Sequence, residues 1–263
     1  MKRILLLTTA IFAVSTVAFA QTKPEVKPSP TAVFPAKKEE AKTVLPTAAQ
    51  ILEKYFVALG GRAANEKLTT RVMRGTVEIP AAGIKGTFES YSKSPNKTFA
   101  VMTLPGVGDI VSSVDGATGW TSNPIQGSRD LQGEELSSKK RDADFLSEFN
   151  LAKTYPKMEV KSTEKIGANE VYVVSAATAE GAAVTFYFDA KTGLMLRRDQ
   201  TETSPEGKIP VQLYFEDFRD VDGVKLPFTT RQVAAQGDAI LRVTEVKHNV
   251  VIDDAKFAKP KAQ

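Results

Sequence analysis

The hydrophobic pattern after Pro46 has the spacing of an amphipathic helix. Thr47 and Gln50 stand three residues apart at its start, the arrangement of a capping box, in which each side chain caps a backbone amide of the other residue. Gly60 and Gly61 can adopt the left-handed backbone that ends many helices. The apolar residues that share one face of this helix are Ile51, Leu52, Tyr55, Phe56 and Leu59. The pattern predicts one helix at the start of a folded domain.

Beyond this helix the apolar residues recur at every second position, which is the period of a half-buried β-strand. Three stretches show the alternation clearly, with apolar members Met73, Val77 and Ile79; Phe99 and Val101; and Val184, Phe186 and Phe188. Glycine, proline and aspartate residues typical of turns stand between such stretches, at 189–193, 205–207, 222–223 and 236–238. Short strands joined by tight turns favour an antiparallel sheet over alternating strands and helices.

A second helical stretch interrupts the strands at about 131–151, where Leu136, Ala143, Leu146 and Phe149 can share one face. Its remaining positions are polar and dense in charge. We expect a helix that lies on the surface of the sheet, and a fold class that is mainly β (α+β).

The first twenty residues have the three parts of a cleavable export signal. Two basic residues precede an uncharged apolar run at 4–19, and the small residues Ala18 and Ala20 stand where signal peptidase needs them. An uncleaved membrane anchor is the alternative, but the run is short for a spanning helix and is interrupted by hydroxyl residues. We therefore expect residues 1–20 to be a signal peptide, a mature chain that begins near Gln21, localisation in the periplasm, and no membrane-spanning segment after cleavage.

The composition of residues 21–45 differs from that of the rest of the chain. This stretch consists mainly of Pro, Lys, Glu, Thr and Ala, and Phe34 is its one aromatic residue. So little apolar surface cannot offset the entropy lost on ordering. We expect a disordered tether at 21–45 and a single folded domain at 46–260.

Charge and cysteine content limit the partners. Removal of Lys2 and Arg3 with the signal lowers the formal charge from +4 to +2. Basic and acidic residues are interspersed, so no basic stripe for nucleic acid is present, and no nucleic-acid partner is expected. The chain contains no cysteine, which excludes disulfides, thiolate metal sites and a lipid-modified N-terminal cysteine.

The sequence offers little to a catalytic mechanism. His248 is the single histidine, so a triad built on histidine or a cluster of metal-binding histidines cannot form, and a lone strand histidine is usually a surface or interface residue. Carboxylates stand in pairs at 216–217, 220 and 222, and 253–254, but these are turn residues or neighbours on opposite faces of a strand. We predict a protein that is not an enzyme and has no catalytic residue, metal or cofactor; a hydrolase with an irregular site is the least favoured alternative.

The apolar face of the predicted strands could serve either as a packed core or as a ligand-binding groove. An antiparallel sheet can close around its own side chains, or it can stay partly open and hold a hydrophobic ligand in its concavity. In the first case the large apolar residues of the strands are simply core. The periodicity of the sequence does not distinguish these two arrangements.

Four short segments then resemble one protein family. Gly86, Phe88, Lys93, Pro95 and Asn96, followed by Asp115-Gly116, Trp120 and Asn123-Pro124, resemble a strand and hairpin segment of the LolA-like periplasmic lipoprotein carriers. Asp189, Thr192, Gly193 and Leu194 resemble the D-x-x-T-G-L hairpin of that family. The stretch from Phe215 to Pro227 and the tail from Asn249 to Pro260 resemble its outer-membrane lipoprotein-sorting relatives. The segments stand in the expected order and together cover most of 46–260.

The resemblance implies an incomplete antiparallel β-barrel with helices that cover its concave face. It also implies a periplasmic binding or carrier protein whose partner is a lipid or an acylated protein, and which performs no catalysis. The candidate groove residues are Phe88, Phe99, Val101, Trp120, Val184, Phe186, Phe188, Leu213 and Phe215. The carriers hold the lid with a basic residue directly before the Pro-Asn pair, a position that is Ser94 here, with Lys93 beside it. An envelope sensor or scaffold that uses the same fold to bind a protein partner is the alternative.

Overall fold

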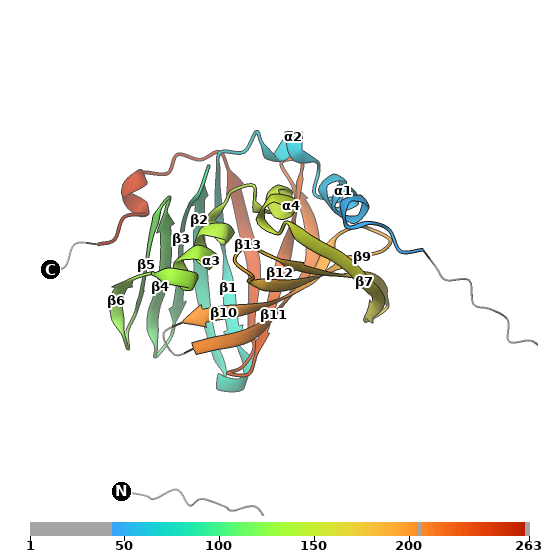
Figure 1. The fold of residues 1–263 in the computed structure, drawn as a ribbon. Coiled ribbons are helices and arrows are strands. Elements are labelled where there is room, and N and C mark those ends of the chain that lie inside the picture. The colour runs from blue at the N-terminus through green and yellow to red at the C-terminus, as the bar shows by residue number, and fades with distance from the viewer. Residues whose placement is uncertain (1–43, 205–206, 261–263) are drawn as a thin grey trace, which may run out of the picture. The chain divides into compact units, whose positions relative to one another are not determined.

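In the computed structural model, the chain is described at residues 44–204 and 207–260, and these residues build one antiparallel sheet of thirteen strands (Figure 1). The strands β1 to β6 are Thr70–Ile79, Ile84–Lys93, Lys97–Leu104, Gly108–Asp115, Thr118–Asn123 and Gly127–Asp130. The strands β7 to β13 are Lys157–Ile166, Asn169–Ala177, Ala183–Asp189, Met195–Ser204, Gly207–Val221, Val224–Ala234 and Ala239–His248.

The sheet consists of two meanders that meet where the first and last strands pair. Its order is β6-β5-β4-β3-β2-β1-β13-β12-β11-β10-β9-β8-β7, so each strand of a meander lies beside its neighbour in sequence. In the central pair, Arg71 of β1 lies opposite His248 of β13. The strands β6 and β7 are the two edges, and the sheet does not close between them. The predicted mainly β class and the incomplete antiparallel barrel are therefore confirmed.

Short helices connect and cover the strands. The α-helices α1 to α4 are Ala48–Ala58, Arg62–Asn65, Gly133–Ala143 and Leu151–Thr154, and the 3-10 helices η1 to η3 are Pro80–Ala82, Ser147–Asn150 and Asp254–Lys256. The helix predicted after Pro46 is confirmed as α1, and its capping box is present: the Thr47 amide donates to Gln50 Oε1, and the Gln50 amide donates to Thr47 Oγ1. No helix among the described residues is long and apolar enough to cross a membrane.

The helical stretch expected at 131–151 is broken at Asp144. The Asp144 carboxylate accepts hydrogen bonds from the Leu146 amide at 3.0 Å and from Asn150 Nδ2 at 2.7 Å. Aspartate that binds the backbone two residues ahead competes with helical hydrogen bonding. The stretch consequently forms α3, η2 and α4 in succession, which together are called the lid segment here.

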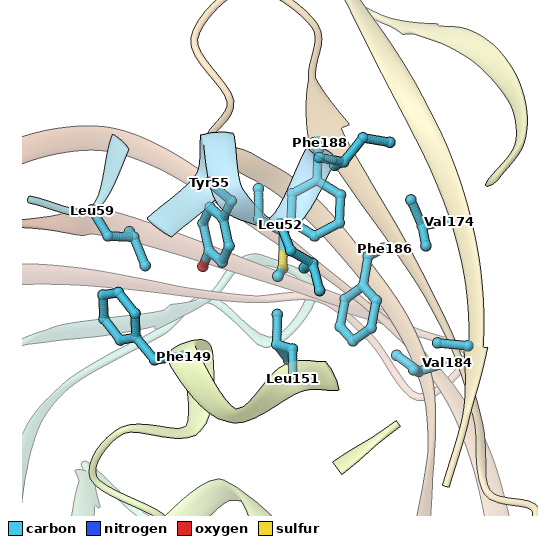
Figure 2. Close-up of a cluster of buried hydrophobic side chains, with 12 residues drawn as sticks. Leu52, Tyr55, Leu59, Phe149, Leu151, Val174, Val184, Phe186 and Phe188 are labelled. Atoms are coloured by element: carbon cyan, nitrogen blue, oxygen red, sulfur yellow. The ribbon is translucent and has the colours of Figure 1, made fainter. Parts of the chain in front are cut away.

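The apolar face of β9 is covered by α1 and by the C-terminal part of the lid segment. In Figure 2, Tyr55 and Leu52 of α1, together with Leu151, point toward the phenylalanines of β9. Phe186 and Phe188 are fully buried, and Phe186 contacts Tyr155 edge-on at 5.3 Å between ring centroids. This part of the concave face is a filled core.

Part of the opposite face, over strands β1 to β5, is covered by the C-terminal residues. Phe257, next to η3, is fully buried in a cluster with Val72 and Ile252, and its carbonyl accepts a hydrogen bond from Trp120 Nε1 at 3.0 Å. Lys256 places its ammonium 4.4 Å from the centre of the Phe99 ring. Helices therefore cover the concave face, and the C-terminal residues cover the opposite face over the first meander.

The predicted signal peptide at 1–20 lies outside the described residues, as does the predicted tether up to residue 43. The described part begins at Val44, which is largely exposed, and α1 begins four residues later.

Candidate functional site

A cavity of about 220 Å³ lies on the concave face, beside the filled core. It is bounded by α1 and α2, by the part of the lid segment around η2, and by strands β1, β10, β11 and β12. Its lining residues are Tyr55, Leu59, Asn65, Arg71, Met73, Phe145, Leu146, Ser147, Glu148, Phe149, Met195, Phe215, Phe218, Lys225, Leu226 and Pro227. We call this space the lid cavity.

The strand wall of the lid cavity is apolar. Met73 of β1 and Met195 of β10 contribute flexible thioether side chains, which adapt to irregular shapes. Phe215 and Phe218 both line the cavity although they are three residues apart, a spacing that puts side chains on opposite faces of a regular strand. Asp217 between them has a positive φ of 54°, and this local departure from strand geometry lets both rings face the same space.

The lid side of the cavity carries a hydrogen-bonded pair of polar residues. The Tyr55 hydroxyl of α1 donates to Glu148 Oε2 of η2 at 2.7 Å. Burial, with the neighbouring Glu148 carboxylate, raises the pKa of Tyr55 well above its usual 10.0. The phenol therefore stays protonated and keeps donating to the carboxylate, which joins α1 to the lid segment.

Arg71 brings a positive charge into the strand wall. Its Nε donates to His248 Nε2 at 3.1 Å, and Nδ1 of the same imidazole lies 2.8 Å from Asp222 Oδ2. This pairing requires the neutral tautomer with its proton on Nδ1. Burial lowers the pKa of Arg71 to about 10, with Glu148 opposing the shift.

His248 was expected at a surface or interface, but its side chain is only 2% exposed. The reason is non-local: β13 pairs with β1, so the imidazole lies between Arg71 and the turn between β11 and β12, which carries Asp222. The resulting chain of Asp222, His248 and Arg71 fixes the position of the guanidinium at the cavity.

A second, largely buried cation, Arg198, lies on the concave face close to the lid segment. Arg198 of β10 has a side chain that is 19% exposed, and its Nη2 lies 3.8 Å from Asp142 of α3. Its buried Nε has no hydrogen-bond partner among the described residues. The concave face under the lid thus holds two guanidiniums, Arg71 and Arg198, both close enough to Glu148 for its charge to act on them.

A larger and more polar cavity of about 540 Å³ lies between α3 and strands β9 to β11. An ion pair between Glu134 and Lys208, at 2.8 Å, connects two of its walls. Arg141, Asp142 and Tyr155 also line it. Its more polar walls contrast with the largely apolar strand wall of the lid cavity. Among the described residues, no cluster of three carboxylate or imidazole side chains could hold a metal ion.

The candidate groove residues from the sequence are divided between the two faces. Phe215 lines the lid cavity, and Leu213, two residues earlier on β11, shares its face. Val184, Phe186 and Phe188 belong to the filled core under α1, and Val184 also lines the polar cavity.

Phe88 shares the cavity face but does not line the cavity. It lies opposite Gly75, where a Cβ would come within 2.6 Å of the Phe88 ring, and Gly75 shares a face with Met73. Phe99 and Trp120 lie on the opposite face beneath the C-terminal residues, together with Val101, which is two positions along from Phe99.

The two residues considered for lid closure make different contacts. The Lys93 ammonium binds the Ile252 carbonyl at 3.0 Å and Asp254 Oδ1 at 2.7 Å, both in the C-terminal residues. The Ser94 amide donates to the Thr69 carbonyl at 2.9 Å. It is the next residue, Pro95, whose carbonyl contacts the lid segment.

Arg71, Glu148 and Arg198 were not among the candidates from the sequence. The sequence did indicate the position of Arg71. Arg71 stands at an even spacing from Met73 and Val77, so in a strand its side chain lies on the same face as these apolar residues. A charge at such a position points toward the covered face of the sheet. No comparable local pattern marks Glu148, whose place depends on how the lid segment folds back.

No protein-family model matches the chain, and no curated protein matches it. Among solved structures, a DUF1329 family protein from Desulfovibrio piger has a TM-score of 0.55 at 12% identity, and the match covers 80% of this chain and 96% of that one. A LolA superfamily protein from Nitrosomonas europaea has a TM-score of 0.51 at 16% identity, and the match covers 82% of this chain and 99% of that one. The chain has a LolA-like fold, which confirms the resemblance of its sequence segments at the level of fold.

Proposed function

We propose that this protein binds a hydrophobic ligand in the lid cavity and carries or presents it without covalent chemistry. The observation that supports this best is the cavity itself, which has an apolar wall of Met73, Met195, Phe215 and Leu226 beside a core that is otherwise filled. Because most apolar side chains of this face pack into the core, a space with an apolar wall beside them is the place where an apolar ligand could be held.

The energetics suit reversible binding. Each buried methylene group contributes about 0.8 kcal/mol, so a chain of moderate length can be held firmly and still released into a membrane of similar apolarity. Release requires only that the lid segment move. Within the described part of the chain, three hydrogen bonds hold its central part to the rest of the domain: the Phe145 amide donates to the Pro95 carbonyl, Arg62 Nη2 to the Phe149 carbonyl, and the Tyr55 hydroxyl to Glu148.

A cavity-filling substitution tests the location of the ligand. Met73→Trp adds an indole to the cavity wall, and we expect at least a tenfold loss of affinity for N-phenyl-1-naphthylamine, a neutral apolar fluorophore. Met102→Trp is the matched control, because Met102 lies opposite Phe88 on the same face but does not line the lid cavity. Unchanged uptake by Met73→Trp, with the wild-type fold retained, would place the ligand elsewhere.

We also propose that the protein works in the periplasm after removal of residues 1–20. Expression of the full chain in a bacterial host followed by N-terminal sequencing of periplasmic material should give a start at or near Gln21. Native mass spectrometry of the same material should show a bound lipid or lipopeptide. A stoichiometric protein partner without lipid would instead favour the scaffold alternative, and a retained N-terminus would contradict the export proposal.

A further inference from the structure

Of the two cations that line the lid cavity, Arg71 and Lys225, Arg71 is the one that forms no ion pair within the described residues. Its one hydrogen bond within the described part of the chain is donated by Nε to His248, and no ion pair there joins it to a carboxylate. Its guanidinium carbon lies 5.4 Å from the centre of the Phe145 ring. The two terminal nitrogens, with four N–H donors, belong to a residue that lines the cavity and have no protein acceptor among the described residues.

The other cation of the lid cavity is already paired with a carboxylate, and the Glu148 carboxylate is hydrogen-bonded to a neutral phenol. Lys225 Nζ binds Asp220 Oδ2 at 2.8 Å, and the Glu148 carboxylate accepts the Tyr55 hydroxyl at 2.7 Å. The partner of Arg71 in the strand wall is a neutral imidazole, which satisfies one donor and adds no negative charge. Arg71 therefore offers the unfilled, planar fork that binds a carboxylate through two parallel hydrogen bonds.

The rest of the cavity decides what carries such an anion. Met73 stands two residues from Arg71 on the same face of β1, so an anionic group on the guanidinium has apolar wall directly beside it. The volume of about 220 Å³ is below the roughly 300–1,000 Å³ typical of small-molecule pockets, which fits one chain better than two.

We infer that the lid cavity selects a single-chain anionic amphiphile, whose carboxylate binds the Arg71 guanidinium while its chain lies along the apolar strand wall. This inference rests on the proposed function and names its ligand class. Asp222 and His248 are positioning residues that hold Arg71 by its Nε and leave its terminal nitrogens for the ligand.

The test compares ligands that differ only in the head. Palmitate and hexadecan-1-ol, both below their aggregation limits, displace N-phenyl-1-naphthylamine from the wild-type mature protein near neutral pH. We expect palmitate to bind about tenfold or more tightly than the alcohol, since a carboxylate forms two hydrogen bonds and an ion pair with the guanidinium, whereas the neutral hydroxyl accepts a single hydrogen bond. Acetate at the same concentration should not displace the probe. Equal affinity for acid and alcohol, or displacement by acetate alone, would overturn the inference.

Variants separate the role of Arg71 from a general loss of structure. Arg71→Met should abolish the preference for palmitate by weakening palmitate far more than the alcohol, and Arg71→Lys should restore part of the difference. Arg74→Met is the matched control, because Arg74 lies on the same strand but pairs with Glu89 and Glu245 on the other face. Weakening of both ligands to the same degree would make Arg71 structural and overturn the inference. Failure of the wild type to bind either ligand would contradict the proposed function itself.

Discussion

The Tyr55 hydroxyl and the Glu148 carboxylate form a 2.7 Å hydrogen bond between the first helix of the domain and the lid segment. The two residues are 93 positions apart in the chain, and no other hydrogen bond between the side chains of α1 and η2 is found among the described residues. The bond closes the lid cavity on its helical side. It therefore couples the stability of the domain to the closure of the site.

Tyr55→Phe should destabilise the protein by about 1–3 kcal/mol, the cost of removing a hydrogen bond to a charged group. Denaturant unfolding followed by circular dichroism measures the change. Tyr172→Phe is the control, since Tyr172 packs against the same core and its hydroxyl makes no hydrogen bond within the described residues. Equal effects of the two substitutions would show that the bond to Glu148 contributes nothing specific.

Phe186→Lys should prevent folding, because Phe186 is fully buried and lies opposite Arg198 in the pairing of β9 with β10. The new cation would be buried beside an existing one, at a cost of several kcal/mol. Thr185→Lys places the same residue on the other face of β9, opposite Asp199, and should leave the fold intact. Limited proteolysis distinguishes the outcomes, and a protease-resistant Phe186→Lys protein would contradict the filled core at this position.

The local elements of the fold could be predicted from the sequence because local patterns determine them. The capping box of Thr47 and Gln50 lies within one turn of helix, and the alternation through Phe186 and Phe188 lies within one strand. The lid-closing position at Ser94 and Lys93 came from the family resemblance and not from a local pattern. The contacts of Lys93 are long-range, because its ammonium lies beside Asp254, 161 positions away along the chain.

The candidate site was harder to predict, since alternation gives two faces of a strand but does not say which is concave. Trp120 and Phe215 both alternate with polar residues, yet one lies beneath the chain end and the other lines the cavity. Where both faces of a sheet are packed against other residues, the apolar positions of the two faces cannot be distinguished in the sequence. The cavity also depends on the pairing of β1 with β13, which brings Arg71 to His248 from 177 positions away.

The stability of the protein should fall as the pH drops below about 6.5. Burial lowers the pKa of His248 below its usual 6.5, and the nearby Arg71 charge adds to the effect, while Asp222 opposes it. The unfolded chain therefore binds a proton at a higher pH than the folded one. The neutral imidazole of His248 therefore contributes fully to the free energy of unfolding above the pKa that His248 has in the unfolded chain. This contribution is lost as the pH falls through the lower pKa that His248 has in the folded protein.

His248→Gln is the variant that tests this dependence, because His248 is the single histidine and no other imidazole titrates in that range. The wild-type free energy of unfolding should change with pH between about pH 6.5 and the lower pKa of His248 in the folded protein. In the His248→Gln variant this slope should be absent. Asp222→Asn should keep a histidine but lower its folded pKa further, since it removes the carboxylate that favours the charged form. A wild-type profile that is flat across this range would contradict the buried, neutral state of the imidazole.

The C-terminal residues should be required for the integrity of the sheet, and the single tryptophan reports on this directly. Phe257 is fully buried, and its carbonyl accepts hydrogen bonds from Trp120 Nε1 and from Ser113 Oγ at 2.8 Å. Phe257→Ala should cost about 3–5 kcal/mol, from lost apolar burial and the cavity left behind. As the chain end loosens, water reaches the indole, so Trp120 emission should shift to longer wavelength.

Lys259→Ala is the control. It removes only an exposed ion pair with Asp130 and should change the free energy of unfolding by less than about 0.5 kcal/mol. An unshifted emission spectrum in Phe257→Ala, together with wild-type stability, would mean that the chain end does not cover this face of the sheet in solution.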